Sequence, residues 1–86
     1  MTFEFTERFH RQYKKLPADV KERLKGQLHR LLADPSHPSL RVKRVQGTVG
    51  IWEASVTDSI RMTFSVRDDT YVLRNIGSHE EVFRKP

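Results

Sequence analysis

His79 is the side chain of this 86-residue sequence whose type and position best suit proton transfer. Ser78 precedes it and Glu81 lies three residues after Ser78, which is the pattern of a capping box, so a short helix is predicted to begin at His79. The positive end of a helix dipole favours a neutral imidazole, and free backbone N–H groups there can hold an anion. A histidine beside a phosphate can then act as general base or acid near neutral pH. Because a lone surface histidine usually has no such role, the residues alone leave His79 a candidate.

Arg61 is the second candidate, because it is the only cation in the two predicted strands of residues 50–66. A guanidinium on a strand presents a rigid fork that suits a bidentate contact with phosphate. A cross-strand ion pair with Glu53 is an equally good interpretation. The alternation places Arg61, Glu53, Ser55 and Thr63 on the face away from the large apolar residues, and we expect that face to be solvated.

Two helices are predicted ahead of these strands. Residues 2–6 alternate as a short strand, and Thr6 can cap a helix that begins at Glu7. Pro17 ends that helix and can open a second one, which carries leucines at helical spacing. We expect the two helices to form a hairpin with basic side chains outside it, and Gly26 to allow close packing between them.

The rest of the chain has the periodicity of strands. Two prolines in the stretch DPSHPS mark a break, after which apolar side chains recur at every second residue. Strands are predicted over residues 40–45, 50–56, 59–66 and 70–76, with a tight turn at 67–69. Gly77 is expected to allow a sharp exit from the sheet. The fold class is therefore α+β: an N-terminal strand, a two-helix hairpin, an antiparallel sheet of about three further strands and a short C-terminal helical turn.

Composition indicates a single domain over residues 1–86. The absence of cysteine excludes disulfides and thiolate metal sites, and no apolar run approaches the ~18 residues of a membrane span, so a cytoplasmic protein is expected. The net charge of +5 is uneven, since residues 1–44 hold eleven Lys and Arg against five Asp and Glu. A basic half of this kind favours polyanionic partners, nucleic acid first, although basic helix surfaces are often simply solvated.

Four short motifs, in order along the chain, resemble the RelE/ParE superfamily of bacterial toxins. They are YKKLP, DPSHPSLRVKRVQG, IRMTF and GSHEEVF, and the resemblance covers nearly the whole chain as one toxin domain. It is nearest to the RelE and YafQ-like branches, which cleave messenger RNA. The resemblance implies a ribosome-dependent, metal-free endoribonuclease that needs no cofactor and inhibits translation in a bacterium or archaeon. In that reaction the ribose 2′-hydroxyl attacks the adjacent phosphorus and expels the 5′-oxygen.

The resemblance also assigns roles to residues. Arg61 matches the arginine that contacts the scissile phosphate, and His79 matches the proton-transfer histidine. Phe83 lies where RelE-like members often carry tyrosine, and it can stack on a base but cannot donate a proton. Glu53 is an alternative base. Substrate RNA is expected to contact Ser55, Lys43 and Arg44. Phosphates of ribosomal RNA are expected to contact Lys14, Lys15, Lys21 and Lys25.

Departures from the family pattern leave three functions open. RelE-like members carry lysines where this chain has Glu53 and Ser55, and the additional histidine and aspartate of YafQ-like sites are absent. The first function is the messenger-RNA endoribonuclease, which the histidine of the last motif favours. The second is a ParE-like inhibitor of DNA gyrase, and the third is a degenerate member that only binds RNA or its antitoxin. In each case an acidic antitoxin that folds on this basic chain in a hetero-oligomer is the expected partner.

Overall fold

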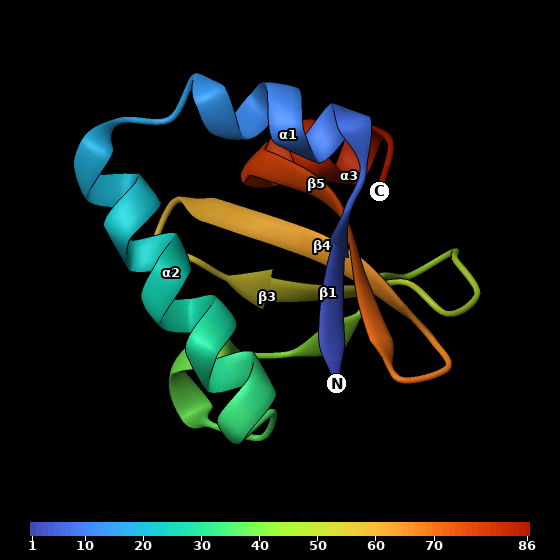
Figure 1. The fold of residues 1–86 in the computed structure, drawn as a ribbon. Coiled ribbons are helices and arrows are strands. Elements are labelled where there is room, and N and C mark those ends of the chain that lie inside the picture. Colours follow the sequence, from blue (N-terminus) through green and yellow to red (C-terminus); the bar gives the residue numbers. More distant parts are fainter.

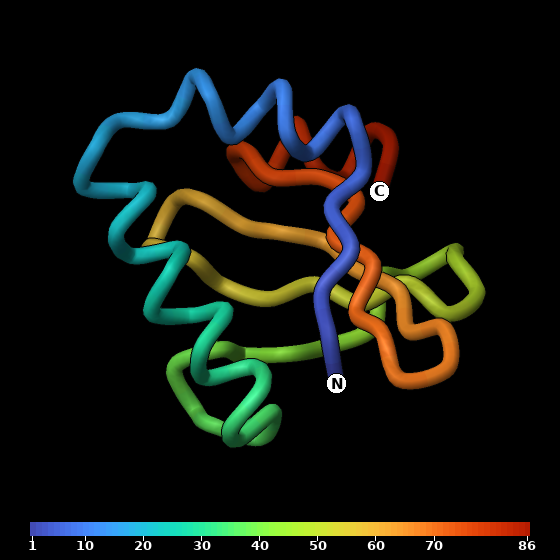
Figure 2. The backbone as a smooth tube through the Cα atoms, viewed as in Figure 1, coloured from blue at the N-terminus to red at the C-terminus, as the bar shows by residue number.

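The computed structural model describes residues 1–86, which form a five-stranded sheet flanked by helices (Figures 1 and 2). The elements in chain order are β1 (Thr2–Phe5), α1 (Glu7–Lys14), α2 (Ala18–Ala33), the 3₁₀ turn η1 (Pro38–Leu40), β2 (Lys43–Arg44), β3 (Trp52–Ser55), β4 (Ile60–Arg67), β5 (Thr70–Ser78) and α3 (His79–Arg84). The strand order is β1-β5-β4-β3-β2. The expected α+β class and element order are confirmed.

The sheet is mixed, because β1 lies parallel to β5 whereas all other neighbours are antiparallel. The two helices carry the chain from the end of β1 to the far side of the sheet, so β1 ends up beside the last strand (Figure 1). The strand predicted over residues 40–45 is shorter than expected. Its first residue, Leu40, belongs to η1, and only Lys43 and Arg44 pair with β3.

One face of the sheet packs on the helices and forms the apolar core. Phe9 of α1 and Leu24 and Leu31 of α2 are buried there. β3, its following residue and β4 contribute alternate residues that the periodicity predicted, Ala54, Val56, Met62 and Phe64, and β5 adds Tyr71, Leu73 and Ile76, with a register shift between Leu73 and Ile76. The rings of Phe64 and Tyr71 meet edge to face, with centroids 5.4 Å apart, which is a favourable geometry for aromatic pairs.

The opposite face of the sheet is not solvated, so that prediction was wrong. Glu53, Ser55, Thr63 and Asn75 are all buried. Thr63 and Asn75 are covered by α3 and the residues after it, which fold over β4 and β5, whereas Ser55 lies beside α2. The Thr63 hydroxyl donates to the Pro86 carbonyl at 2.9 Å, and Asn75 Nδ2 donates to the Lys85 carbonyl at 3.0 Å. An antiparallel sheet often keeps one face wet, but here a six-residue helix converts that face into a second, polar interior.

The helices begin at the caps predicted from the sequence, but α1 and α2 do not pack closely against each other at Gly26 as expected. The Thr6 hydroxyl accepts a hydrogen bond from the Phe9 N–H at 3.1 Å, as predicted for the start of α1. The predicted use of Gly26 in packing was wrong, because nothing lies within 4 Å of where its Cβ would be. Figure 1 shows α1 packed on β5, and α2 running crosswise to α1.

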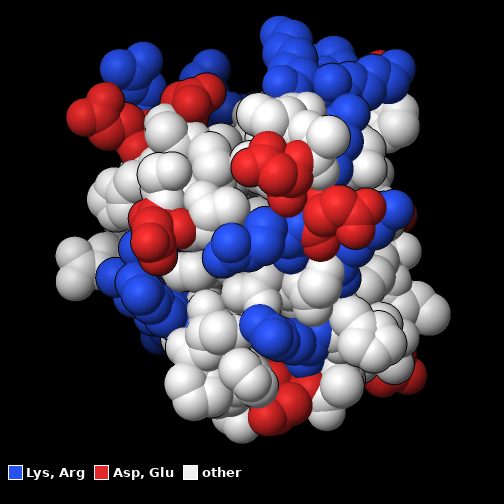
Figure 3. Space-filling view, turned by 90° about the vertical axis from the view of Figure 1, so that its left-hand side faces the viewer, with Lys and Arg blue, Asp and Glu red and all other residues white.

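Charged side chains of both signs lie on the surface that includes α2 (Figure 3). The α2 segment carries Lys21, Arg23, Lys25 and Arg30 among two acidic residues. No helix in the structure has the length and apolar character needed to cross a membrane.

Asn75 should be one of the residues on which this covered face depends. Its side chain bonds to the Gln12 amide of α1 and to the Lys85 carbonyl, and Gln12 also accepts from the Ile76 N–H at 2.9 Å. Asn75→Ala leaves buried polar groups unpaired, so we expect a loss of about 1–3 kcal/mol in the free energy of unfolding. Urea unfolding followed by circular dichroism measures it.

Thr2→Ala is the matched control, because it removes only an exposed hydroxyl pair with Thr70 and should change the free energy of unfolding by less than about 0.5 kcal/mol. Equal midpoints for the two variants would contradict the role given to Asn75.

Candidate functional site

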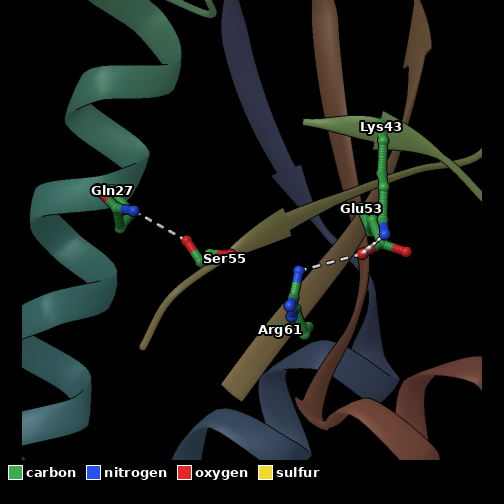
Figure 4. Close-up of polar contacts among 5 residues, drawn as sticks. All are labelled: Gln27, Lys43, Glu53, Ser55 and Arg61. Carbon is green, nitrogen blue, oxygen red and sulfur yellow. Dashed lines mark hydrogen bonds and ion pairs between the residues drawn. The ribbon is translucent and has the colours of Figure 1, made fainter. Parts of the chain in front are cut away.

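A buried carboxylate lies between two cations on the covered face of the sheet (Figure 4). Glu53 of β3 has a side chain only 1% exposed, and its Oε1 is 3.2 Å from Arg61 Nη1 and 3.8 Å from Lys43 Nζ. Lys43 is directly opposite Glu53 in the β2–β3 ladder, and Arg61 arrives diagonally from β4, where it pairs with Ser55. The cross-strand pairing of Arg61 with Glu53 is therefore confirmed.

The energetics of this cluster explain why its members stay together. Transferring an unpaired carboxylate from water into a protein interior costs several kcal/mol, so Glu53 requires its cations. The Arg61 side chain is 16% exposed, and one of its nitrogens stays on Glu53. The Lys43 side chain is 64% exposed and reaches the same oxygen from the edge of the sheet. The carboxylate thus fixes the position of an arginine that still reaches the surface.

His79 is held at the junction of β5 and α3 by the predicted capping box, which is confirmed. The Ser78 hydroxyl accepts from the Glu81 N–H at 3.3 Å, and Glu81 Oε1 accepts from the Ser78 N–H at 3.2 Å. His79 is exposed as the first residue of α3, and its ring meets that of Phe83 edge to face with centroids 4.2 Å apart. The cap and the aromatic contact together define where the imidazole lies.

Gly77 has a different use from the one predicted. It does not make a sharp exit with a positive φ, because it remains paired with Arg61 inside β5, so that expectation was wrong. A Cβ on Gly77 would lie 3.4 Å from three atoms of the Glu81 side chain. The glycine therefore leaves room for Glu81 to fold back onto the strand and close the box.

An open hollow of about 380 Å³ collects five of the seven residues predicted to act in catalysis or substrate binding. It is lined by Lys43, Arg44, Gln46, Glu53, His79 and Phe83. Arg61 adjoins this group through its bond to Glu53. The hollow combines cations, a titratable imidazole and an aromatic face, which suits an RNA strand with a phosphate near the cations and a base near the ring.

The hollow contains one residue that the sequence did not reveal and lacks several that it suggested. Gln46 follows β2, and nothing in its type or spacing marked it. Ser55 instead lines a separate cleft beside α2, and its hydroxyl is buried without a hydrogen-bond partner. No group of three or more His, Asp or Glu side chains is placed to hold a metal ion.

The four helix lysines lie away from the hollow, on α1, α2 and the residue after α1. Lys14 and Lys15 are exposed and form no ion pair. Lys21 Nζ lies 5.2 Å from the centre of the Tyr13 ring, and Lys25 Nζ is 3.7 Å from Glu22 Oε1. They therefore form a surface distinct from the site around His79.

Solved structures of toxins share this fold. YafQ from E. coli strain BL21(DE3) superposes with a TM-score of 0.79 at 17% identity, covering 94% of this chain and 96% of that one. A mutant of E. coli toxin RelE in the free state gives 0.75 at 24% identity, with 98% and 90% covered. The RelE toxin in the RelB–RelE complex of Methanococcus jannaschii gives 0.75 at 18% identity, with 95% and 98% covered. No family model and no curated protein sequence matches the chain. The fold expected from the motifs is confirmed as that of these toxins.

The ion pair around Glu53 should be strongly coupled. Arg61→Met leaves a buried carboxylate with only Lys43, so we expect a loss of roughly 3 kcal/mol in the free energy of unfolding, at the low end for breaking a buried pair. Adding Glu53→Gln removes the buried charge and should recover most of that loss. A double-mutant cycle of urea unfolding measures the coupling.

Arg67→Met serves as the control, because its pair with Glu4 at 2.8 Å is exposed on both sides and should contribute less than about 1 kcal/mol. Glu53 and Arg61 substitutions that add within about 0.3–0.5 kcal/mol would contradict the coupling.

The capping turn that carries His79 should weaken in acid. Hydrogen bonds with Ser78, of its side chain first and of its backbone second, lower the pKa of Glu81 below its usual 4.5; desolvation opposes them and the charge of Arg84 adds to them. A lowered pKa means that the contribution of Glu81 to stability is complete above its usual pKa and is lost as the pH falls through the lowered one. The Ser78 amide resonance in an NMR titration should therefore shift below about pH 4.5. The same amide in Glu81→Gln should not titrate, and an unshifted wild-type amide would show that the box does not depend on this charge.

Proposed function

We propose that this protein is the toxin of a type II toxin–antitoxin system and cleaves messenger RNA on the ribosome in the cytoplasm of a bacterium or archaeon. The observation that carries the proposal is the gathering of Arg61, Lys43 and Arg44 with His79 and Phe83 at one hollow of a RelE-like fold. Cleavage by the ribose 2′-hydroxyl requires a base for that hydroxyl, positive charge for the developing phosphorane and an acid for the 5′-oxygen. The hollow offers cations for the developing charge and His79 for one of the two proton transfers, and the other proton is exchanged with water or the ribosome.

Arg61 stabilises the charge on the scissile phosphate. Its Nη1 stays on Glu53, while a guanidinium has five N–H donors, so the remaining ones can meet a phosphate oxygen. Lys43 and Arg44 extend the positive charge along β2, where the incoming strand binds. Stacking on Phe83 orients a base, a role that needs only the π-face of the ring.

His79 transfers the proton, and Glu53 positions the cations. The imidazole is exposed and is placed by the capped start of α3 and by its contact with Phe83, and histidine is the side chain that most often transfers protons in catalysis. Glu53 is the second candidate for the base, but its carboxylate is almost inaccessible and shared between two cations. Substrate therefore reaches His79 before it reaches Glu53.

The exposed surfaces suit the remaining partners. Lys14, Lys15, Lys21 and Lys25 lie on helices away from the hollow, where they contact phosphates of ribosomal RNA. An apolar groove of about 250 Å³ between α1 and α2, lined by Phe5, Phe9 and Tyr13, is rimmed by His10 and Lys25. Phe5 is 47% exposed, and an acidic antitoxin segment with apolar anchors fits such a surface. The RelE of Methanococcus jannaschii was crystallised with the antitoxin RelB, which supports a partner of this class.

The catalytic assignment predicts different failures for His79 and Arg61. His79→Ala should lower the single-turnover rate of cleavage of ribosome-bound messenger RNA on the order of 10²-fold and flatten one side of its pH profile. Arg61→Lys keeps a cation beside Glu53, so it should lower the rate while preserving the shape of the profile. Rates measured over about pH 5–9 span the range in which histidine side chains usually titrate.

His10→Ala is the matched control, because His10 is exposed on α1 away from the hollow. A wild-type rate and profile for His79→Ala would make His79 only the first residue of a capped turn and Glu53 the next base to test. Intact ribosome-bound messenger RNA together with inhibition of purified gyrase would instead assign the chain to the ParE-like toxins.

A further inference from the structure

We propose that the cleft between α2, η1 and the β3–β4 turn is a second phosphate-binding site, which extends the RNA-binding surface of the protein away from His79. This inference rests on the proposed function for the identity of the ligand as RNA. The cleft has a volume of about 730 Å³ and is separate from the hollow that His79 lines. Its basic side chains are Arg23 and Arg30 of α2 and Arg41, the residue after η1.

The three arginines have no acidic partners. None of them lies within ion-pair distance of a carboxylate. Of the two carboxylates at the cleft, Glu22 is already paired with Lys25, which leaves Asp58 alone. Three unpaired guanidinium groups around one cleft form a surface that attracts oxyanions, for which arginine has the matching geometry.

Arg30 is held in place by a polar network at the base of the cleft. Its Nη1 donates to Gln27 Oε1 at 3.0 Å and to Ser39 Oγ at 3.1 Å. Gln27 is itself only 6% exposed, and its Nε2 donates to the Ser39 and Ser55 carbonyls, which ties α2 to η1 and β3. The Nε and Nη2 donors of Arg30 have no partner in the protein, so a positioned guanidinium keeps donors for a ligand.

Arg41 occupies a backbone conformation that does not favour arginine. Its φ of 48° and ψ of 47° are left-handed, where a Cβ is unfavourable and glycine or asparagine fits better. Stability alone therefore does not explain an arginine here. The same residue lines the cleft, so the use of its charge there accounts for an arginine at this position.

The cleft and the hollow share strand β3. Ser55 lines the cleft, Glu53 lines the hollow, and Ser55 is paired with Arg61 in the β3–β4 ladder. Ser55 and Glu53 are two residues apart, which is roughly 7 Å along the strand, so the cleft and the hollow meet at neighbouring positions of β3. Figure 4 shows Gln27 on α2 and, beside it, Ser55, Arg61, Glu53 and Lys43 following one another across the sheet. A polyphosphate strand is thus a better match than an isolated anion.

The test compares RNAs that reach one or both sites, by fluorescence anisotropy without ribosomes. Arg23→Gln combined with Arg41→Asn should weaken binding of a single strand of about nine nucleotides on the order of 10-fold at low salt, since each lost phosphate contact reduces the salt slope by about 0.7. Binding of a trinucleotide, which fills only the hollow, should not change. Arg11→Gln combined with Arg67→Gln removes the same two charges outside the cleft and should bind both RNAs as wild type does.

Arg41→Asn should unfold at the same temperature as wild type or higher, because asparagine tolerates the left-handed region, so a loss of binding is separated from a loss of fold. Unchanged affinity and salt slope for the longer RNA overturn the proposal. The proposal is also overturned if the cleft variant loses affinity only for inorganic pyrophosphate, which makes the ligand a small anion. A loss of affinity only for a polyglutamate peptide of equal charge overturns it as well, because the ligand is then an acidic protein.

The catalytic roles of His79 and Arg61 are tested separately from the RNA site at the cleft. His79→Ala should retain the length-dependent RNA binding, since it leaves the cleft intact. If His79→Ala and Arg61→Lys cleave like wild type while the cleft variant still loses binding, the proposed catalytic roles are wrong and the cleft remains an RNA site.

Discussion

The buried charge of Glu53 is the constraint on which the rest of the polar face depends. A carboxylate 1% exposed needs compensation from within the protein, and here the compensation comes from two neighbouring strands. This requirement fixes the register of β2 on β3 and the orientation of Arg61 on β4. The cations at the hollow are therefore positioned by the fold before any ligand binds, which lowers the cost of ordering them on binding.

Helix α3 has two roles, because it covers the polar face of the sheet and also carries residues of the candidate site. Thr63 and Asn75 are satisfied by carbonyls of the last two residues, so the buried polar row exists only when this segment is in place. His79 and Phe83 belong to the same short helix. A helix of six residues has little stability of its own. The position of the imidazole therefore depends on both the capping box and the packing of α3 on the sheet.

The sequence predicted well the features that local chemistry determines. The Thr6 cap, the Ser78–Glu81 box and the strand periodicity around Met62 and Phe64 all reflect interactions between residues close in the chain. The burial of Thr63 could not be predicted in this way, because alternation reports two faces but not what covers each of them. The open surroundings of Gly26 depend likewise on where α1 lies relative to α2, which no local pattern encodes.

The type of a residue predicted which side chains gather at the hollow better than strand alternation did. Arg61 and His79 stood out because a strand cation and a capped histidine are uncommon, and Gln46 did not because its type is ordinary. Ser55 was grouped with Glu53 by alternation alone, yet the strand leads it toward α2 rather than toward His79.

The positions of the cations also show how positive charge reaches β3 although that strand carries no lysine or arginine of its own. Glu53 of β3 is paired with Lys43 from β2 and with Arg61 from β4. Positive charge therefore reaches the same surface from the neighbouring strands. A phosphate near Arg61 competes with Glu53 for one cation but need not displace it, because a guanidinium can donate to two anions at once. The carboxylate also acts as a permanent counterion that offsets the repulsion between Arg61 and Lys43.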